Sequence, residues 1–137
     1  MTEVRYPDAM INGVPVVVTP AEIDVTSADG LRSALLKAAA NGHSTLVVDM
    51  TRTQFCDSSG LHTLFAAHKR ARADGRQVLL VIPDTAVLRV FAITGMDRVI
   101  PNFTSLDEAL ADAAATANGR SRQQRTGMTC QGPAGTA

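Results

Sequence analysis

Short apolar runs and longer segments with a helical pattern alternate along this chain. The runs over 46–50 and 78–82 are nearly continuous, rich in Val, Leu and Ile, and bounded by polar residues. Such runs are typical of strands covered on both faces, so we expect these two in the interior of a sheet. A third short run over 98–100 predicts one more strand.

The N-terminal part of the pattern predicts a β-hairpin. Apolar arms over 10–11 and 14–19 flank the dipeptide Asn12-Gly13, which supplies the positive φ angles that a type I′ turn needs. Pro15 in the second arm has no amide hydrogen to donate. We therefore expect its position to face away from a partner strand or to form a bulge.

Helices are predicted where apolar residues recur at intervals of three and four. Cap residues and glycines mark the ends of these segments. The first segment has cap oxygens at Thr26, Ser27 and Asp29 and ends at Asn41-Gly42, the second covers 61–72, the third runs from Pro83-Asp84 to Gly95, and the fourth begins at the capping box Ser105-Leu106-Asp107-Glu108.

These elements follow the order β-β-α-β-α-β-α-β-α. Strands that alternate with helices are joined by right-handed crossovers and lie mostly parallel, and the hairpin adds a mixed edge. The predicted fold class is therefore α/β, with one domain over 1–117, a mixed, mostly parallel sheet of four to five strands and about four helices. The sequence over 118–137 has no periodicity, so we expect a disordered C-terminal tail there.

The composition fits a single globular domain and argues against several kinds of partner. The 137 residues are 45% hydrophobic, and 13 basic residues balance 13 acidic ones. Balanced charge and only 4% aromatic residues disfavour nucleic acid and an anionic membrane as partners. Every apolar run is far shorter than the roughly 20 residues that cross a bilayer, so we expect a cytoplasmic protein.

Catalytic and cofactor sites lack their usual motifs. Ser58 and His62 share a helical face, but no nucleophile elbow surrounds the serine, so we predict no catalytic residues and no enzyme. The sequence has no phosphate-binding glycine loop, and His43 and His68 do not pair with His62 at ligand spacing, so we expect no cofactor and no metal. We interpret Cys56 as a small buried hydrophobe.

One polar cluster remains, over 55–61, where a buried-looking strand leads into the second predicted helix. If Asp57 or Ser58 caps this helix, the free amides and the positive end of the dipole favour a negative charge by about 0.3–1 kcal/mol. A phosphoryl group on Ser58 would be tolerated there, yet it would oppose a partner docking on the same surface. On local physics alone, a simple helix cap is the preferred interpretation.

Four motifs give the chain a resemblance to a known family. They are Leu46-Val47-Val48-Asp49-Met50, Phe55-Cys56-Asp57-Ser58-Ser59-Gly60-Leu61, Gly75 before the run over 78–82, and Phe91-Ala92-Ile93-Thr94-Gly95-Met96. Through these motifs the sequence resembles the STAS-domain family, specifically the bacterial anti-sigma factor antagonists. The resemblance extends over about 14–113.

The resemblance implies a switch in binding. In this family the first serine of the Asp-Ser-Ser-Gly-Leu element, here Ser58, is phosphorylated by the anti-sigma factor, which is also a serine kinase. It implies that the unphosphorylated protein binds this kinase and frees a sigma factor, that phosphorylation releases the protein, and that a serine phosphatase resets it. We expect a monomer or a weak dimer.

The resemblance also implies which residues meet the partner. The family commonly has Gly-Glu-Leu-Asp after its second strand; here Ala21 replaces the glycine, while Glu22 and Asp24 are kept. Asp24 is expected to flank Ser58. The implied partner-binding residues are Glu22, Asp24, Asp57, Ser58, Ser59, Gly60, Leu61 and His62.

A second hypothesis remains open at this point. The chain could be a STAS module that senses a small ligand, or a scaffold subunit in a stress-signalling complex, with Ser58 incidental. A pocket without this serine at its rim would favour that hypothesis.

Overall fold

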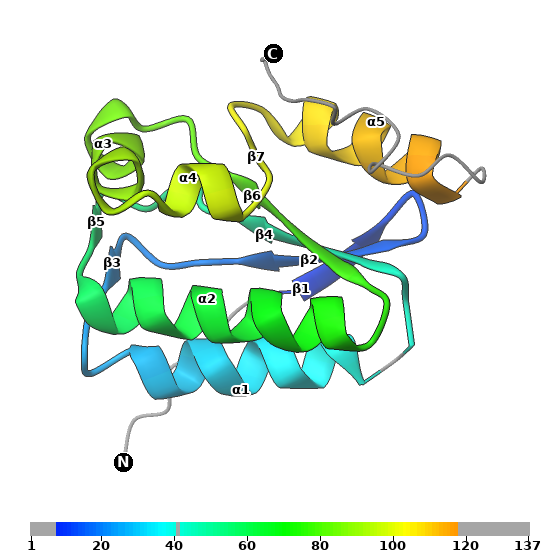
Figure 1. The fold of residues 1–137 in the computed structure, drawn as a ribbon, viewed down its shortest axis with the longest axis horizontal. Coiled ribbons are helices and arrows are strands. Elements are labelled where there is room, and N and C mark those ends of the chain that lie inside the picture. The colour runs from blue at the N-terminus through cyan, green and yellow to red at the C-terminus, as the bar shows by residue number, and fades with distance from the viewer. Residues whose placement is uncertain (1–7, 41, 118–137) are drawn as a thin grey trace.

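The structure, a computed structural model, describes residues 8–40 and 42–117. The tail predicted over 118–137 lies outside the described residues. Figure 1 shows the arrangement of the elements. The strands are β1 Asp8–Ile11, β2 Val14–Val18, β3 Glu22–Ile23, β4 Thr45–Asp49, β5 Phe55–Cys56, β6 Gln77–Val81 and β7 Asn102–Phe103, and the helices are α1 Ala28–Ala39, α2 Ser58–Ala73, α3 Thr85–Thr94, α4 Met96–Val99 and α5 Leu106–Ala117.

The main sheet is mixed and mostly parallel, as predicted. Its strand order is β1-β2-β4-β6-β7, in which only β1 and β2 pair antiparallel. Asn12 and Gly13 in the hairpin turn have φ angles of 55° and 78°, as a type I′ turn requires. β2 pairs with β4 from Val16 onward, so Pro15 stands outside that ladder.

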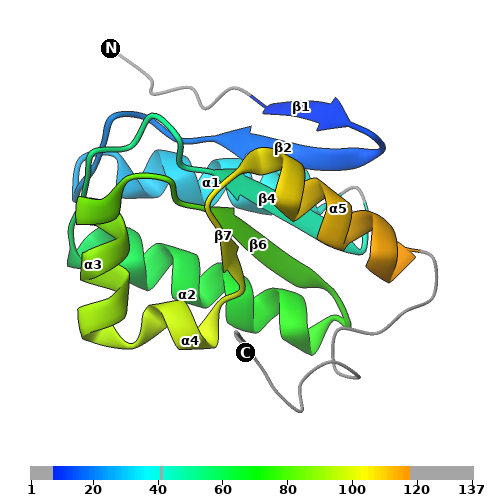
Figure 2. The ribbon, with the colours of Figure 1, turned by 90° about the horizontal axis from the view of Figure 1, so that it is seen from above.

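Both faces of the sheet are covered, which explains the continuous apolar runs of β4 and β6. Val48 and Leu80 belong to the core shared with α1, α2 and α3. Val47 and Leu79, which alternate with them, pack instead in a second core with α5. In Figure 1, α5 lies above the sheet and α1 and α2 lie below it, and Figure 2 shows the same arrangement from above, with α5 toward the viewer. Within the described part of the chain, no helix has the length and apolar character needed to span a membrane.

A second sheet, made of β3 and β5 alone, lies beyond the ends of β2 and β4. The two strands are parallel, with Glu22 opposite Phe55 and Ile23 opposite Cys56. The sequence pattern did not predict them, because a two-residue strand is too short to show a period. Figure 1 shows β3 and β5 at the same end of the molecule as α3.

The predicted strand over 98–100 is wrong. Val99 ends helix α4, and Ile100 is fully buried in the core beneath the sheet. The strand next to β6 is β7, which begins at Asn102. The Asn102 amide group donates hydrogen bonds to the carbonyl oxygens of Asp97, at 2.7 Å, and Ile100, at 2.9 Å. These bonds hold the chain in the turn after α4, and a short apolar run does not by itself distinguish a strand from a buried helix end.

Two of the predicted helix ends are confirmed in detail. The Asp84 carboxylate accepts hydrogen bonds from two amides in the first turn of α3, and Gly95, with φ 81°, ends that helix in the left-handed conformation. The predicted capping box of α5 forms only in part. The Ser105 hydroxyl accepts a hydrogen bond from the Glu108 amide at 3.2 Å, whereas the Glu108 carboxylate accepts one from the Thr104 hydroxyl at 3.3 Å.

His68 is a buried polar side chain in the middle of α2. It is 7% exposed and stacks on Phe65, with ring centroids 6.4 Å apart. Its Nδ1 atom has no hydrogen-bond partner among the described residues. Burial, and secondarily the nearby Arg72 guanidinium, lowers the pKa of His68. The folded protein therefore favours the neutral ring more strongly than the unfolded chain does.

This pKa shift predicts a loss of stability in mild acid. Because the folded pKa lies below the ordinary value of 6.5, the contribution of His68 is complete above that pH and is lost as the pH falls through the folded pKa. We expect His68→Gln to flatten the fall in unfolding free energy as the pH drops below about 6.5, measured by urea denaturation. His62→Gln, at an exposed position on the same helix, is the matched control. An unchanged pH dependence in His68→Gln would contradict this assignment.

Candidate partner-binding site at the start of α2

Asp57 caps helix α2, and Ser58 is the first residue inside the helix. The Asp57 carboxylate accepts hydrogen bonds from the amides of Ser59, at 2.8 Å, and Gly60, at 3.3 Å. Of the two caps that the sequence left open, the structure selects Asp57. The hydroxyl-bearing residue Ser58 is exposed.

This cap changes the electrostatic argument for a phosphate at Ser58. The sequence suggested free amides at the start of the helix, but two of them already bind the Asp57 carboxylate. A phosphoryl group on Ser58 would therefore compete with this carboxylate or remain without those donors. The helix dipole still favours negative charge, but the adjacent carboxylate opposes it. We therefore expect a phosphoryl group on Ser58 to lie at the protein surface and not among the amides that Asp57 caps.

The small β3–β5 sheet brings the two acidic segments of the site together. The Asp57 amide donates a hydrogen bond to the Ile23 carbonyl oxygen at 3.0 Å, so Asp24 and Asp57 follow paired strand ends. The two segments are about thirty residues apart in the chain, and only the fold makes them neighbours. This placement supports the expectation that Asp24 flanks Ser58.

The Asp24 carboxylate is held in the turn that leads into α1. Its Oδ1 atom accepts hydrogen bonds from the Thr26 hydroxyl at 2.6 Å and from the amides of Thr26, at 2.9 Å, and Ser27, at 3.3 Å. The Thr26 hydroxyl bond is the main cause that lowers the pKa of Asp24. The Ser27 hydroxyl, one of the predicted caps of α1, instead accepts a hydrogen bond from the Asp24 amide. The Asp24 carboxylate is thereby kept charged and fixed in direction.

The predicted partner-binding residues differ in how far they reach the surface. Glu22, Ser58 and His62 are exposed, whereas Gly60 is buried. Half-buried positions are occupied by Asp24, Asp57, Ser59 and Leu61. Glu22, Ser58 and His62 therefore form the surface that a partner can contact, whereas Gly60 contributes through packing inside the protein.

Two exposed apolar side chains beside this surface were missed by the sequence analysis. Phe55 lies in the segment between the predicted strand over 46–50 and the second predicted helix, and it is 51% exposed, whereas its neighbour Cys56 is buried. Val25, directly after Asp24, is 71% exposed. Large exposed apolar groups next to polar ones are typical of sites where proteins associate. The alternation of Phe55 outward and Cys56 inward follows from the period of a strand, but β5 itself was not predicted.

Cys56 is the small buried hydrophobe that the sequence suggested. It is 4% exposed, and burial, with a smaller effect of the Asp57 charge, raises its thiol pKa to about 12. The thiolate is therefore strongly disfavoured at neutral pH. Among the described residues, Ser58 and His62 share no hydrogen bond, and no three His, Cys, Asp or Glu side chains are grouped as a metal site.

Comparison with known proteins identifies the family. A family model described as the STAS domain matches residues 6–109, most of the chain. The chain belongs to the STAS domain family. The anti-sigma-F factor antagonist RsfB of Mycobacterium tuberculosis is 30% identical over 101 residues, which cover 72% of this chain and 80% of that protein.

Solved STAS structures have the same fold. The crystal structure of an anti-sigma factor antagonist from Mycobacterium paratuberculosis aligns with a TM-score of 0.68 and 30% identity, covering 80% of this chain and 92% of that one. The Bacillus cell fate determinant SpoIIAA, solved in its phosphorylated form, aligns with a TM-score of 0.60 and 20% identity, covering 78% and 97%. The second likeness supports the STAS fold alone.

Gly60 anchors the start of α2 against the β3–β5 sheet, and this predicts that a larger residue destabilises the site. A Cβ atom at this position would lie 2.6 Å from Ile23 Cγ2 and 2.7 Å from Cys56 Sγ. We expect Gly60→Ala to lower the unfolding free energy by up to about 2 kcal/mol, because overpacking costs about 1–3 kcal/mol and the gain in helix propensity offsets only about 1 kcal/mol of it. Urea denaturation measures the change.

Two further variants separate packing from propensity. Ala66→Gly, at an exposed position of α2, measures the loss of unfolding free energy that comes from helix propensity alone, without a change in packing. Combining Gly60→Ala with Cys56→Ala removes one of the two close contacts, so the double variant should be more stable than the sum of the single losses predicts. Gly60→Ala more stable than the parent protein by the full propensity gain of about 1 kcal/mol would refute the close packing of α2 on β3 and β5.

Proposed function

We propose that this STAS protein is an anti-sigma factor antagonist whose binding is switched by phosphorylation of Ser58. The observation that carries the proposal is an exposed serine, directly after the Asp57 cap, on a surface that also presents Glu22 and Asp24. Two relatives that are 30% identical to this chain are called anti-sigma factor antagonists, which supports the same role here.

The unmodified surface suits a protein partner. Val25 and Phe55 offer apolar area, while Glu22 and Asp24 offer negative charge at its edge. A partner with an apolar centre and basic groups facing Glu22 and Asp24 would match this surface. In the proposed mechanism that partner is an anti-sigma factor with serine kinase activity, and its capture frees a sigma factor.

Phosphorylation would reverse the match without remodelling the fold. The phosphoryl group adds about −1.5 to −2 charge beside carboxylates that are already present. The first-turn amides of Ser59 and Gly60 are engaged by Asp57, so these donors do not neutralise the new charge. Burying it in the interface would desolvate an uncompensated charge, which disfavours the complex. A serine phosphatase would restore binding.

The protein acts in this proposal as a binding module and kinase substrate, not as an enzyme. It requires neither a cofactor nor a metal, and its partners are proteins rather than nucleic acid or a membrane. It would work in the cytoplasm, where sigma factors operate, as a monomer or a weak dimer.

The proposal predicts that Ser58 is the residue that the kinase phosphorylates. Incubation with the cognate kinase and ATP should add one phosphoryl group, detected by intact mass, and Ser58→Ala should abolish it. Ser59→Ala is the matched control, because Ser59 is the next residue of the same helix but is half-buried. It should be labelled as the parent protein is. Undiminished labelling of Ser58→Ala would exclude Ser58 as the phosphorylation site.

The proposal also predicts that a negative charge at Ser58 weakens binding of the kinase. Ser58→Asp should weaken kinase binding at least tenfold, about 1.4 kcal/mol, because it introduces an uncompensated charge. Ser58→Asn has nearly the same shape without the charge and should bind much more tightly than Ser58→Asp. Isothermal titration calorimetry measures both. Equal affinities of the two variants would remove the electrostatic switch, even if Ser58 is phosphorylated.

A further inference from the structure

A cavity of about 220 Å³ lies between α1 and α2, away from Ser58. Its α2 wall runs from Thr63 to Asp74, whereas Ser58 is at the opposite end of that helix and does not line it. The volume is far more than one water molecule needs and somewhat less than the about 300–1,000 Å³ of sites for drug-sized ligands. The cavity therefore has room for a small organic molecule.

The walls of this cavity are mainly apolar because the two helices face each other through small residues. Ala38 and Ala39 of α1 stand opposite Ala67 and Ala71 of α2, and no long side chain from these four positions fills the space. The floor includes residues of β4 and β6, among them Leu46 and Val78.

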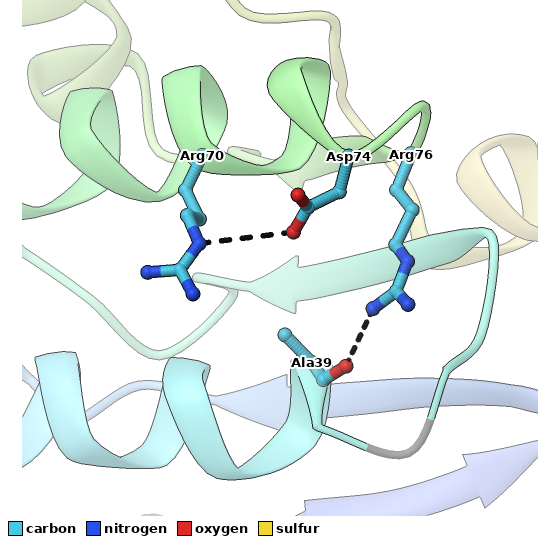
Figure 3. A network of polar contacts seen from close by, with 4 residues as sticks. All are labelled: Ala39, Arg70, Asp74 and Arg76. Carbon is cyan, nitrogen blue, oxygen red and sulfur yellow. Dashed lines mark hydrogen bonds and ion pairs between the residues drawn. The ribbon is translucent and has the colours of Figure 1, made fainter.

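The polar groups at the rim are predominantly cationic. The lining includes Arg32, Arg70 and Arg76, with Asp74 as the single carboxylate. Asp74 is already paired with Arg70, whose Nε atom lies 3.7 Å from its carboxylate. Arg76 donates a hydrogen bond of 2.7 Å to the Ala39 carbonyl oxygen and so links the turn after α2 to the end of α1. Figure 3 shows both contacts.

Two lining groups have no partner within the described part of the protein and are available to a ligand: the exposed guanidinium of Arg32 and the buried Nδ1 atom of His43. Arg32 has no hydrogen-bond or ion-pair partner within 8–40 and 42–117. His43 also lines the cavity, and its buried Nδ1 atom lacks a partner in the same part of the chain. Buried polar atoms are nearly always paired in native proteins, so an unpaired nitrogen at a cavity wall points to a missing partner.

We propose that this cavity binds a small organic acid, with its apolar body between the helices and its carboxylate at the arginine and histidine rim. Charge complementarity selects an anion, because Arg32 and Arg76 remain unneutralised after Arg70 and Asp74 are paired. The chain's own segment over 118–137 is a poor occupant. It carries three arginines and no acidic side chain, so the rim would repel it.

This site goes beyond the proposed antagonist role and does not depend on it. A pocket without Ser58 at its rim is the feature that favours a ligand-sensing STAS module, and the cavity has that feature. Both sites lie along α2, so the ligand site and the switch can coexist in one molecule.

The test uses the full chain and 3-phenylpropanoate as the probe. Backbone amide shifts in ¹⁵N NMR titrations should change around Leu36, Thr45, Ala67 and Arg76. The neutral analogue 3-phenylpropan-1-ol has the same apolar body, and it should bind about fivefold more weakly, which corresponds to the upper end of the range for an exposed ion pair. Equal binding of acid and alcohol, or shifts confined to another surface, would overturn the proposal.

Matched variants then test the site itself. Arg32→Gln removes one rim charge at an exposed position and should weaken the probe's binding about fivefold, whereas Arg89→Gln on α3 should leave it unchanged. Ala66→Leu places a larger side chain at the rim and should abolish binding, while Ala73→Leu, exposed on the same helix but outside the cavity lining, should not. Unaltered binding in both Arg32→Gln and Ala66→Leu would refute this location.

Discussion

The position of Ser58 depends on how the chain is tied together just beyond the ends of β2 and β4. The Thr53 hydroxyl donates a hydrogen bond of 2.6 Å to the Pro20 carbonyl oxygen and lies 2.6 Å from the Thr19 hydroxyl. Because Thr53 has one hydroxyl hydrogen, Thr19 is the donor in the second contact. Both threonines are at most 1% exposed. Losing the Thr53 hydroxyl would remove both the donor to the Pro20 carbonyl oxygen and the near partner of the buried Thr19 hydroxyl.

This link starts the pairing that builds the site. The Ala21 carbonyl oxygen accepts hydrogen bonds from the amides of Gln54, at 2.7 Å, and Phe55, at 3.2 Å, and β3 and β5 continue from there. Gly60 then allows α2 to approach Ile23 and Cys56 closely. The backbone pairing of β3 with β5 and the lack of a Cβ atom at Gly60 thus set the position and direction of the start of α2. The Asp57 cap fixes the first turn of this helix. The surface around Ser58 is therefore rigidly supported, which suits a switch that changes charge rather than shape.

The parts that sequence could predict are those with a long period or a strong local signal. The hairpin at Asn12-Gly13, the central strand β4 and the Gly95 helix end all followed from such signals and are confirmed. The family resemblance, not periodicity, singled out Ser58. A helix in place of the strand over 98–100 was missed, because short apolar runs have no unique period.

The remaining misses depend on contacts between distant segments. Nothing in the local sequence shows that Phe55 faces outward, that Thr19 meets Thr53, or that small residues on α1 and α2 leave a cavity between them. Each is a consequence of where the fold places residues that are more than twenty positions apart in the chain, or of strands of only two residues. Such features become visible only in three dimensions.

Hydrogen–deuterium exchange with and without the cognate anti-sigma factor kinase maps the docking surface of the proposed switch without assuming which residues take part. We expect the complex to protect the amides over 21–27 and 54–62 together, since β3 and β5 present one surface. The same protection should disappear when Ser58 is phosphorylated. Protection centred on α5 or on β1, with 54–62 unchanged, would contradict the proposed docking surface.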